Sequence, residues 1–196
     1  EVSLSDADLR RIAVLAHAHA GIVLTPNKKL MVQGRLQPLL RAHRCQTYGE
    51  YLNFLQQADA KQLQAFINAL TTNLTAFFRE VHHFHILAKH LLDPRLHHPH
   101  RVVWSAACST GEEAYSIAMT LVESYGSFSP PVRVLATDID TAVLKHAEQG
   151  VYPLTRLRDL SEQRLKRFFI VDERAGAAAV RPELRSLIVF RQVNLL

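Results

Sequence analysis

The stretch Arg101-Val-Val-Trp-Ser-Ala-Ala-Cys-Ser-Thr-Gly-Glu-Glu-Ala-Tyr115 decides the fold of this chain. Its apolar start predicts a strand over 101–107, and small residues then lead into an amphipathic helix. A strand, a small-residue loop and a helix in this order expose backbone N–H groups at the helix N-terminus. α/β proteins commonly bind a nucleotide or cofactor there.

A second buried strand, Val134-Leu-Ala-Thr-Asp-Ile-Asp140, ends in two carboxylates. An acidic side chain at the carboxyl end of such a strand can accept hydrogen bonds from the two hydroxyls of a ribose. We expect Asp138 to do this; Asp140 is the alternative, because it could equally cap the helix that begins near Thr141. With the loop before it, this strand indicates an adenosine-type cofactor.

From residue 101 onward, short apolar runs alternate with helices, as in a parallel sheet with crossovers. A helix should end at Gly150, and another should begin at Ser161. Strand-like segments near 168–172, 177–181 and 187–193 then predict a small antiparallel unit, inserted over 151–192.

The first 72 residues have the 3.6-residue period of amphipathic helices. Ser5 should start a helix that Gly21 ends, and a second helix after Pro26 should be kinked or interrupted at Pro38. Thr47 starts a third helix with a capping box that includes Glu50. The apolar stripe of a fourth helix consists of Leu63, Phe66, Ile67 and Leu70. We therefore expect an all-helical domain over 1–72, followed by a linker and helix over 73–100.

Composition limits the class of protein. With 196 residues, 48% of them hydrophobic, the chain can bury a core, and no apolar run reaches the ~20 residues needed to cross a bilayer. Without an apolar leader segment, we expect a cytoplasmic protein with no membrane insertion. Cys45 and Cys108 should be reduced thiols. The net charge of +5 suits an anionic partner, which could be nucleic acid, a membrane surface or a protein rich in glutamate.

Histidines are dense between residues 82 and 100, in His82-His-Phe-His85, at His90 and in His97-His-Pro-His100. Because no cysteine or carboxylate stands at ligand spacing with them, we expect surface histidines and no metal.

Upstream of the first strand stands Thr71-Thr-Asn-Leu-Thr-Ala-Phe-Phe-Arg-Glu80, followed by His82-His-Phe84. With the two strand-end blocks, this order of motifs resembles the CheR-type chemotaxis receptor methyltransferases, from about residue 8 to the last residue. The resemblance implies an α/β fold: a small all-helical N-terminal domain, then a Rossmann-like methyltransferase domain over 101–196 that carries a receptor-binding β-subdomain. Chains of this family continue past the segment that matches 193–196, so we expect the C-terminal part of the fold to be lacking.

The same resemblance implies a function. S-adenosyl-L-methionine would be the cofactor and S-adenosyl-L-homocysteine the product, and the acceptors would be glutamates in the cytoplasmic domains of methyl-accepting chemoreceptors. A glutamate carboxylate is already ionised at pH 7, so neither a general base nor a catalytic triad is expected.

Site residues follow from the resemblance position by position. Asn73 and Thr75 would hold the amino-acid end of the cofactor, and Arg79, the expected catalytic residue, would bind a carboxylate of either the cofactor or the substrate. Glu113 would accept from the cofactor ammonium, while Glu112 could simply favour the helix N-terminus. The full cofactor set is Asn73, Thr75, Arg79, Ala107, Glu113, Asp138, Asn194 and Leu195. Without the resemblance, Asn73 and Thr75 could cap a helix and Arg79 could pair with Glu80.

A basic face of the second helix should dock the acidic receptor. It consists of Lys28, Lys29, Arg35, Arg41 and Arg44. Two alternatives remain. One is a non-catalytic receptor-binding or regulatory fragment. The other is a nucleic-acid methyltransferase, although the sequence has no base-stacking motif, so no nucleic-acid partner is expected.

Overall fold

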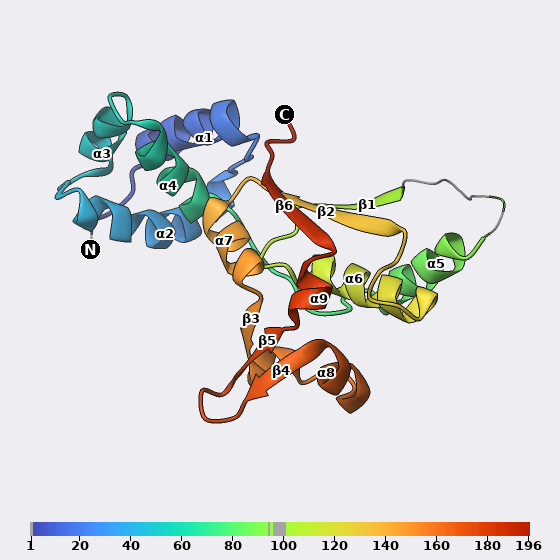
Figure 1. Ribbon diagram of the computed structural model, residues 1–196. Helices are drawn as coiled ribbons and strands as arrows, with labels where there is room; N and C mark the ends of the chain where they lie inside the picture. The colour runs from blue at the N-terminus through green and yellow to red at the C-terminus, as the bar shows by residue number, and fades with distance from the viewer. Residues whose placement is uncertain (1, 94, 96–100) are drawn as a thin grey trace. The chain divides into compact units, whose positions relative to one another are not determined.

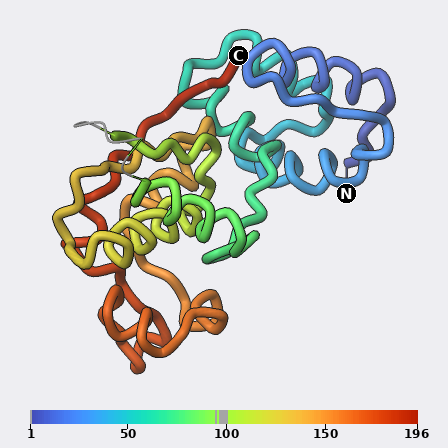
Figure 2. The backbone as a smooth tube through the Cα atoms, turned by 90° about the vertical axis from the view of Figure 1, so that its right-hand side faces the viewer, coloured from blue at the N-terminus to red at the C-terminus, as the bar shows by residue number. Residues whose placement is uncertain are grey.

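The computed structural model describes residues 2–93, 95 and 101–196, which form two compact units (Figure 1 and Figure 2). The first unit contains the chain up to Thr72 together with 139–141 and 194–196, and the second contains 73–138 and 142–193. Each unit has a hydrophobic core of its own.

The first unit is helical, as the sequence predicts. Its elements are α1 (Asp6–Ala20), the 3₁₀ turn η1 (Pro26–Lys28), α2 (Lys29–Ala42), α3 (Tyr48–Leu55) and α4 (Ala60–Leu70). The core consists of the apolar stripes of these helices, including the fully buried Ile12, Leu36, Tyr48, Tyr51 and Phe66.

The helix ends of the first unit agree with the sequence at most positions. The Ser5 side chain accepts from the N–H of Asp8 and caps α1. The Thr47 hydroxyl accepts from the N–H of Glu50, but the Glu50 carboxylate accepts from the N–H of Gln46, so only half of the expected capping box forms. The expected interruption at Pro38 is wrong, because α2 runs through it from Lys29 to Ala42.

The second unit begins with α5 and alternates strands with helices, as expected. Its elements are α5 (Val81–Leu91), β1 (Arg101–Ala106), α6 (Glu112–Tyr125), β2 (Val132–Asp138), α7 (Thr141–Gln149), β3 (Val151–Pro153), the 3₁₀ turn η3 (Leu154–Leu157), α8 (Glu162–Phe168), β4 (Phe169–Asp172), β5 (Ala177–Val180), α9 (Pro182–Arg185) and β6 (Ile188–Gln192).

Two sheets organise this unit. The first is wholly parallel with strand order β1-β2-β6, and it aligns Val103 with Val134 and Val134 with Ile188. The second is antiparallel with order β3-β5-β4. In Figure 2 the orange segment 151–180 forms a separate lobe of this unit. We call this lobe the antiparallel unit.

The expectation that 187–193 belongs to the antiparallel unit is wrong, and its predicted boundary at residue 192 moves to about residue 180. Strand β6 pairs with β2 in the parallel sheet, because α9 carries the chain back to the sheet edge. The alternation that predicts a strand there tells which side chains are buried, but it does not name the neighbouring strand.

Helices cover one face of the parallel sheet. Val132, Val134 and Ala136 of β2 are fully buried on the face against which α6 packs, with α5 and α9 beside α6 (Figure 1). On the opposite face Val102 and Trp104 are 62% and 53% exposed. None of the helices in the described part of the chain is both long and apolar enough to cross a membrane.

Candidate cofactor site

The loop between β1 and α6 folds back onto the end of β2. The N–H groups of Ala107 and Cys108 both donate to the carbonyl oxygen of Thr137, at 2.8 Å each. Ala107 and Ser109 adopt positive φ values of 102° and 51°, which side chains other than glycine rarely take. Strained backbone of this kind persists only where its surroundings enforce it, and it concentrates at functional sites.

Gly111 closes this loop and is required by its packing. Its φ is 97°, and a Cβ there would lie 2.8 Å from the Cβ of Ala147 and 2.9 Å from the hydroxyl oxygen of Tyr152. The start of α6 can therefore approach α7 and β3 only because this residue has no side chain.

Ser109 joins two of the expected cofactor residues. Its N–H donates to the Asp138 carboxylate at 2.8 Å, and its hydroxyl donates to the Asn73 carbonyl oxygen at 3.2 Å. Asp138 is buried at the end of β2. Residues 73, 109 and 138, far apart in sequence, thus meet at the carboxyl edge of the parallel sheet.

The segment 73–80, which we call the motif segment, is not helical at its start. The first helix after it, α5, has Glu80 at its N-cap, so neither Asn73 nor Thr75 caps a helix. Arg79 is exposed and donates from Nη1 to the carbonyl oxygen of Leu74 at 3.1 Å. The carboxylate of Glu80 lies 3.8 Å from Nδ1 of His82. The geometry favours neither the capping role nor the Arg79–Glu80 pair.

The two glutamates at the start of α6 differ in surroundings. Glu113 is exposed, and its carboxylate accepts from the Ser105 hydroxyl at 2.6 Å. Glu112 is 1% exposed; it accepts from the Thr110 hydroxyl at 2.6 Å and forms an ion pair with Arg156. Glu112 therefore does more than favour the helix N-terminus.

Burial raises the pKa of the Cys108 thiol to about 12, and the charge of Asp138 adds to this effect. The thiol is therefore protonated at neutral pH and is a poor nucleophile. Cys108 acts as a packed residue beneath the loop.

The remaining expected cofactor residues lie in the first unit. Asn194 is exposed and donates from Nδ2 to the carbonyl oxygen of His19 at 3.0 Å, and Leu195 is exposed. Asp140, the alternative to Asp138, accepts from the Thr71 hydroxyl at 2.6 Å.

Comparison with known proteins identifies the family. Residues 7–71 match the model of the CheR methyltransferase all-alpha domain, and residues 73–196 match that of the CheR methyltransferase SAM-binding domain. The chain belongs to the CheR methyltransferase family. This agrees with the motif resemblance and with the fold described above.

Curated relatives of this CheR-family chain include three chemotaxis proteins. It is 49% identical to the chemotaxis protein methyltransferase of Salmonella typhimurium, covering 100% of this chain and 68% of that protein. It is 49% identical to chemotaxis protein methyltransferase 2 of Pseudomonas aeruginosa, covering 96% and 68%. It is 46% identical to the chemotaxis protein methyltransferase of Escherichia coli, covering 100% and 68%.

S-adenosylmethionine is the methyl donor for which the matched domain of this CheR-family chain is built. The side chains expected at the site fit this cofactor chemically. An exposed carboxylate at Glu113 suits an ammonium group, a buried carboxylate at Asp138 suits vicinal hydroxyls, and the exposed Ala107 allows close approach to its backbone.

The basic face of this CheR-family chain is divided. Lys29 pairs with Asp6 at 2.6 Å, and Arg35 donates from Nη1 to the carbonyl oxygens of Leu70 and Thr71 at the end of α4, at 3.0 and 2.6 Å. Lys28, Arg41 and Arg44 are exposed. Arg35 therefore has a structural role, and those three are the exposed members of the expected docking set.

Within the described residues, no group of three or more histidine, cysteine, aspartate or glutamate side chains could hold a metal ion. The stretch His97–His100 lies outside the described residues.

Sequence reasoning missed Ser109, Ser105 and Arg156. Ser109 stands inside the quoted loop, where the positive φ of a small polar residue has no sequence signature. The buried role of Glu112 had no sequence signal either, because a doublet of acids at a helix start is equally compatible with two exposed side chains.

Proposed function

We propose that this chain transfers the methyl group of S-adenosylmethionine to glutamate side chains in the cytoplasmic domains of methyl-accepting chemoreceptors. The observation that carries the proposal is the Ser109 junction, which ties the motif segment to Asp138 at the carboxyl edge of a parallel sheet. Ligands of open α/β sheets bind at this edge. Because these receptor domains lie in the cytoplasm, we propose that the enzyme acts there.

The site divides the cofactor among its residues. Asp138, whose carboxylate also accepts from the N–H of Ser109, accepts from the ribose hydroxyls. Glu113 accepts from the ammonium, and Asn73 and Thr75 hold the amino-acid end. Ala107 offers its backbone, and the family resemblance assigns Asn194 and Leu195 to the adenine.

The cofactor supplies an electrophilic methyl group, which a glutamate oxygen takes in one displacement that leaves S-adenosylhomocysteine. Since a cation and an anion become two neutral molecules, charge is lost on the way to the transition state. A site that excludes water favours this loss. The contribution of the protein is to orient the carboxylate at roughly 3–3.5 Å from the methyl carbon.

Arg79 is the residue we propose for carboxylate orientation. Its exposed guanidinium is held by one hydrogen bond to Leu74, which leaves N–H groups free to bind a carboxylate. An arginine on the substrate carboxylate also stabilises the ground state, so its benefit must come from orientation.

The exposed basic residues Lys28, Arg41 and Arg44, at the two ends of α2, would dock the acidic receptor surface. Exposed charges of one sign raise the rate of encounter with a partner of opposite charge. We assign these residues to substrate docking, together with Lys29 and Arg35, which also bind partners within the first unit.

The test is methylation by the purified chain with labelled S-adenosylmethionine. One acceptor is a receptor cytoplasmic fragment with glutamates at its methylation sites, and the matched control has glutamine there. We expect base-labile label in the glutamate fragment alone. Cofactor binding without label would favour the non-catalytic fragment, and label in added DNA or RNA would favour the nucleic-acid enzyme.

A further inference from the structure

We propose that Arg156 and Arg164 of the antiparallel unit are positioning residues that hold the motif segment 73–80 in its cofactor-binding conformation. The inference rests on the proposed function for its meaning. It adds that the antiparallel unit is coupled to the cofactor site, because two side chains of the antiparallel unit hold the motif segment in place.

The first link is made by Arg156 in η3. Its Nη2 group donates to the carbonyl oxygen of Thr75 at 3.1 Å and also to the carboxylate of Glu112. Glu112 is 1% exposed, so its carboxylate is almost completely shielded from water, and Arg156 is its ion-pair partner. One guanidinium therefore connects the antiparallel unit, the motif segment and the start of α6.

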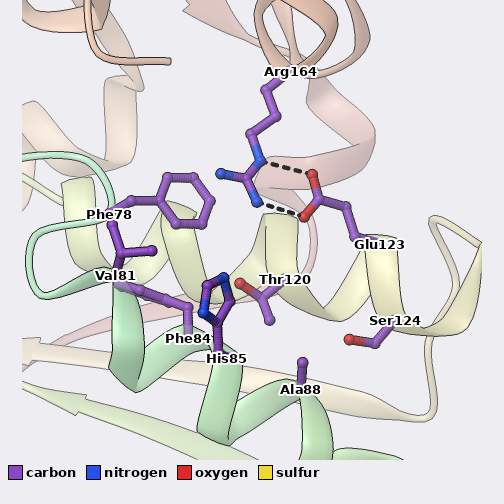
Figure 3. A pocket seen from close by; sticks show the side chains of 9 residues that line it. All are labelled: Phe78, Val81, Phe84, His85, Ala88, Thr120, Glu123, Ser124 and Arg164. Carbon is purple, nitrogen blue, oxygen red and sulfur yellow. Dashed lines mark hydrogen bonds and ion pairs between the residues drawn. The ribbon is translucent and has the colours of Figure 1, made fainter. Parts of the chain in front are cut away.

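The second link is made by Arg164 in α8 (Figure 3). Its Nε and Nη2 groups bind the two carboxylate oxygens of Glu123 on α6, at 2.8 Å each. This two-point contact fixes the plane of the guanidinium. Its central carbon lies 3.8 Å from the centre of the Phe78 ring, so the guanidinium covers that ring in a cation–π contact.

The motif segment needs such external support. Residues 73–76 belong to neither a helix nor a strand, and Phe78 and Glu80 have positive φ values of 51° and 57°. A cavity of about 250 Å³ lies beside the Phe78 ring, between α5, α6 and α8. Backbone in these conformations persists when neighbouring groups enforce it. The two arginines act at both halves of the segment, at Thr75 and at Phe78.

A direct probe of this positioning is the N–H of Phe78, which donates to the buried hydroxyl of Ser116 at 2.9 Å. If the arginines hold the segment, their removal lets this bond open more often. Hydrogen exchange at 73–80 reports that opening without requiring cofactor or substrate.

The experiment compares Arg156→Ala, Arg164→Ala and Arg156→Lys with the control Arg158→Ala, an exposed arginine two residues from Arg156. We measure hydrogen exchange of peptides covering 73–80 and 1–72, and the Kd for S-adenosylmethionine with its stoichiometry by calorimetry. We expect faster exchange at 73–80 alone and a Kd raised by about tenfold, at unchanged stoichiometry, in both alanine variants. Arg156→Lys should recover part of the affinity, since lysine keeps the charge but not the fork.

A purely structural role for the arginines would lower the binding stoichiometry or speed exchange throughout, without raising the Kd of the folded fraction. That result, or unchanged exchange and Kd in folded variants, would overturn the proposal. If Arg156→Ala does not fold, Arg164→Ala and Arg156→Lys decide the question. A parent chain that binds no cofactor would instead remove the proposed function, while the exchange comparison would still test the positioning.

Discussion

Ser109 shows how a single small residue assembles the candidate site. Its backbone N–H and its hydroxyl reach two different parts of the chain, the carboxylate of Asp138 and the carbonyl oxygen of Asn73. Its positive φ is what turns these two donors apart. The loop thus holds the motif segment in a fixed position relative to the end of β2.

At this scale, Asp138→Asn should weaken S-adenosylmethionine binding by about 1–3 kcal/mol, since the ribose hydroxyls lose a charged acceptor. Asparagine retains an oxygen that can accept from the N–H of Ser109, so the loop should keep its conformation. Calorimetry measures the affinity, and thermal unfolding serves as the control for folding. Unchanged affinity would exclude Asp138 from the site.

Arg79→Lys should reduce methylation of the receptor fragment by at least about tenfold, because lysine cannot make the planar two-point contact with a carboxylate. Steady-state kinetics with varied cofactor and varied receptor fragment would show which KM rises. A rise in the KM for cofactor assigns Arg79 to the cofactor carboxylate, and a fall in kcat with both KM values unchanged assigns it to orientation of the substrate. Parental turnover would contradict both assignments.

Helix α2 illustrates why a run of charges is not a uniform surface. Its basic residues have different tasks, because Arg35 satisfies backbone carbonyls at the end of α4 while Arg41 is exposed. Helix ends leave carbonyl groups without intrahelical partners, and an arginine can supply the missing donors. Only the exposed members of the run remain for a partner.

For this element, Arg41→Glu should lower kcat/KM for the receptor fragment by roughly threefold at low salt, and it should flatten the salt dependence. The affinity for S-adenosylmethionine should not change. Lys61→Glu is the matched control, since Lys61 is exposed on α4 and its replacement changes the charge equally. Equal losses in both variants, or no salt dependence in the parent, would exclude the docking face.

Across the whole molecule, buried acids that stay protonated make the fold sensitive to alkali. Burial raises the pKa of Cys108 to about 12, and it also raises the pKa of Tyr51, Tyr115 and Tyr152. In the unfolded chain a thiol loses its proton near pH 8.5 and a phenol near pH 10. The folded state therefore binds more protons above about pH 8.5, and stability must fall as pH rises.

We expect the free energy of unfolding in urea to fall by about 3 kcal/mol between pH 8 and pH 10, with about 2 kcal/mol of the loss due to Cys108. In Cys108→Ala the loss should be less than half as large, because the thiol proton is absent from both states. Denaturant titrations at the two pH values measure this difference. A free energy that does not change with pH, or equal losses in the two proteins, would contradict the expectation.

The local elements could be predicted from the sequence, because each depends on residues close together in the chain. The stop of α1 at Gly21 and the cap of the same helix at Ser5 follow from local hydrogen bonding and backbone preference. The strand and loop from Arg101 and the strand end at Asp138 follow from apolar patterning, and they pointed to the correct cofactor class.

Only the tertiary structure shows which strands and side chains contact one another. Burial alternation at Ile188 and Phe190 predicts a strand equally well in either sheet, and only the return of the chain through α9 places β6 beside β2. Arg35, Ser109 and Arg156 act on groups 29 to 81 residues away in sequence. Sequence period determines which side of an element is buried, but the identity of what lies against it depends on how distant segments pack, and no local pattern encodes that.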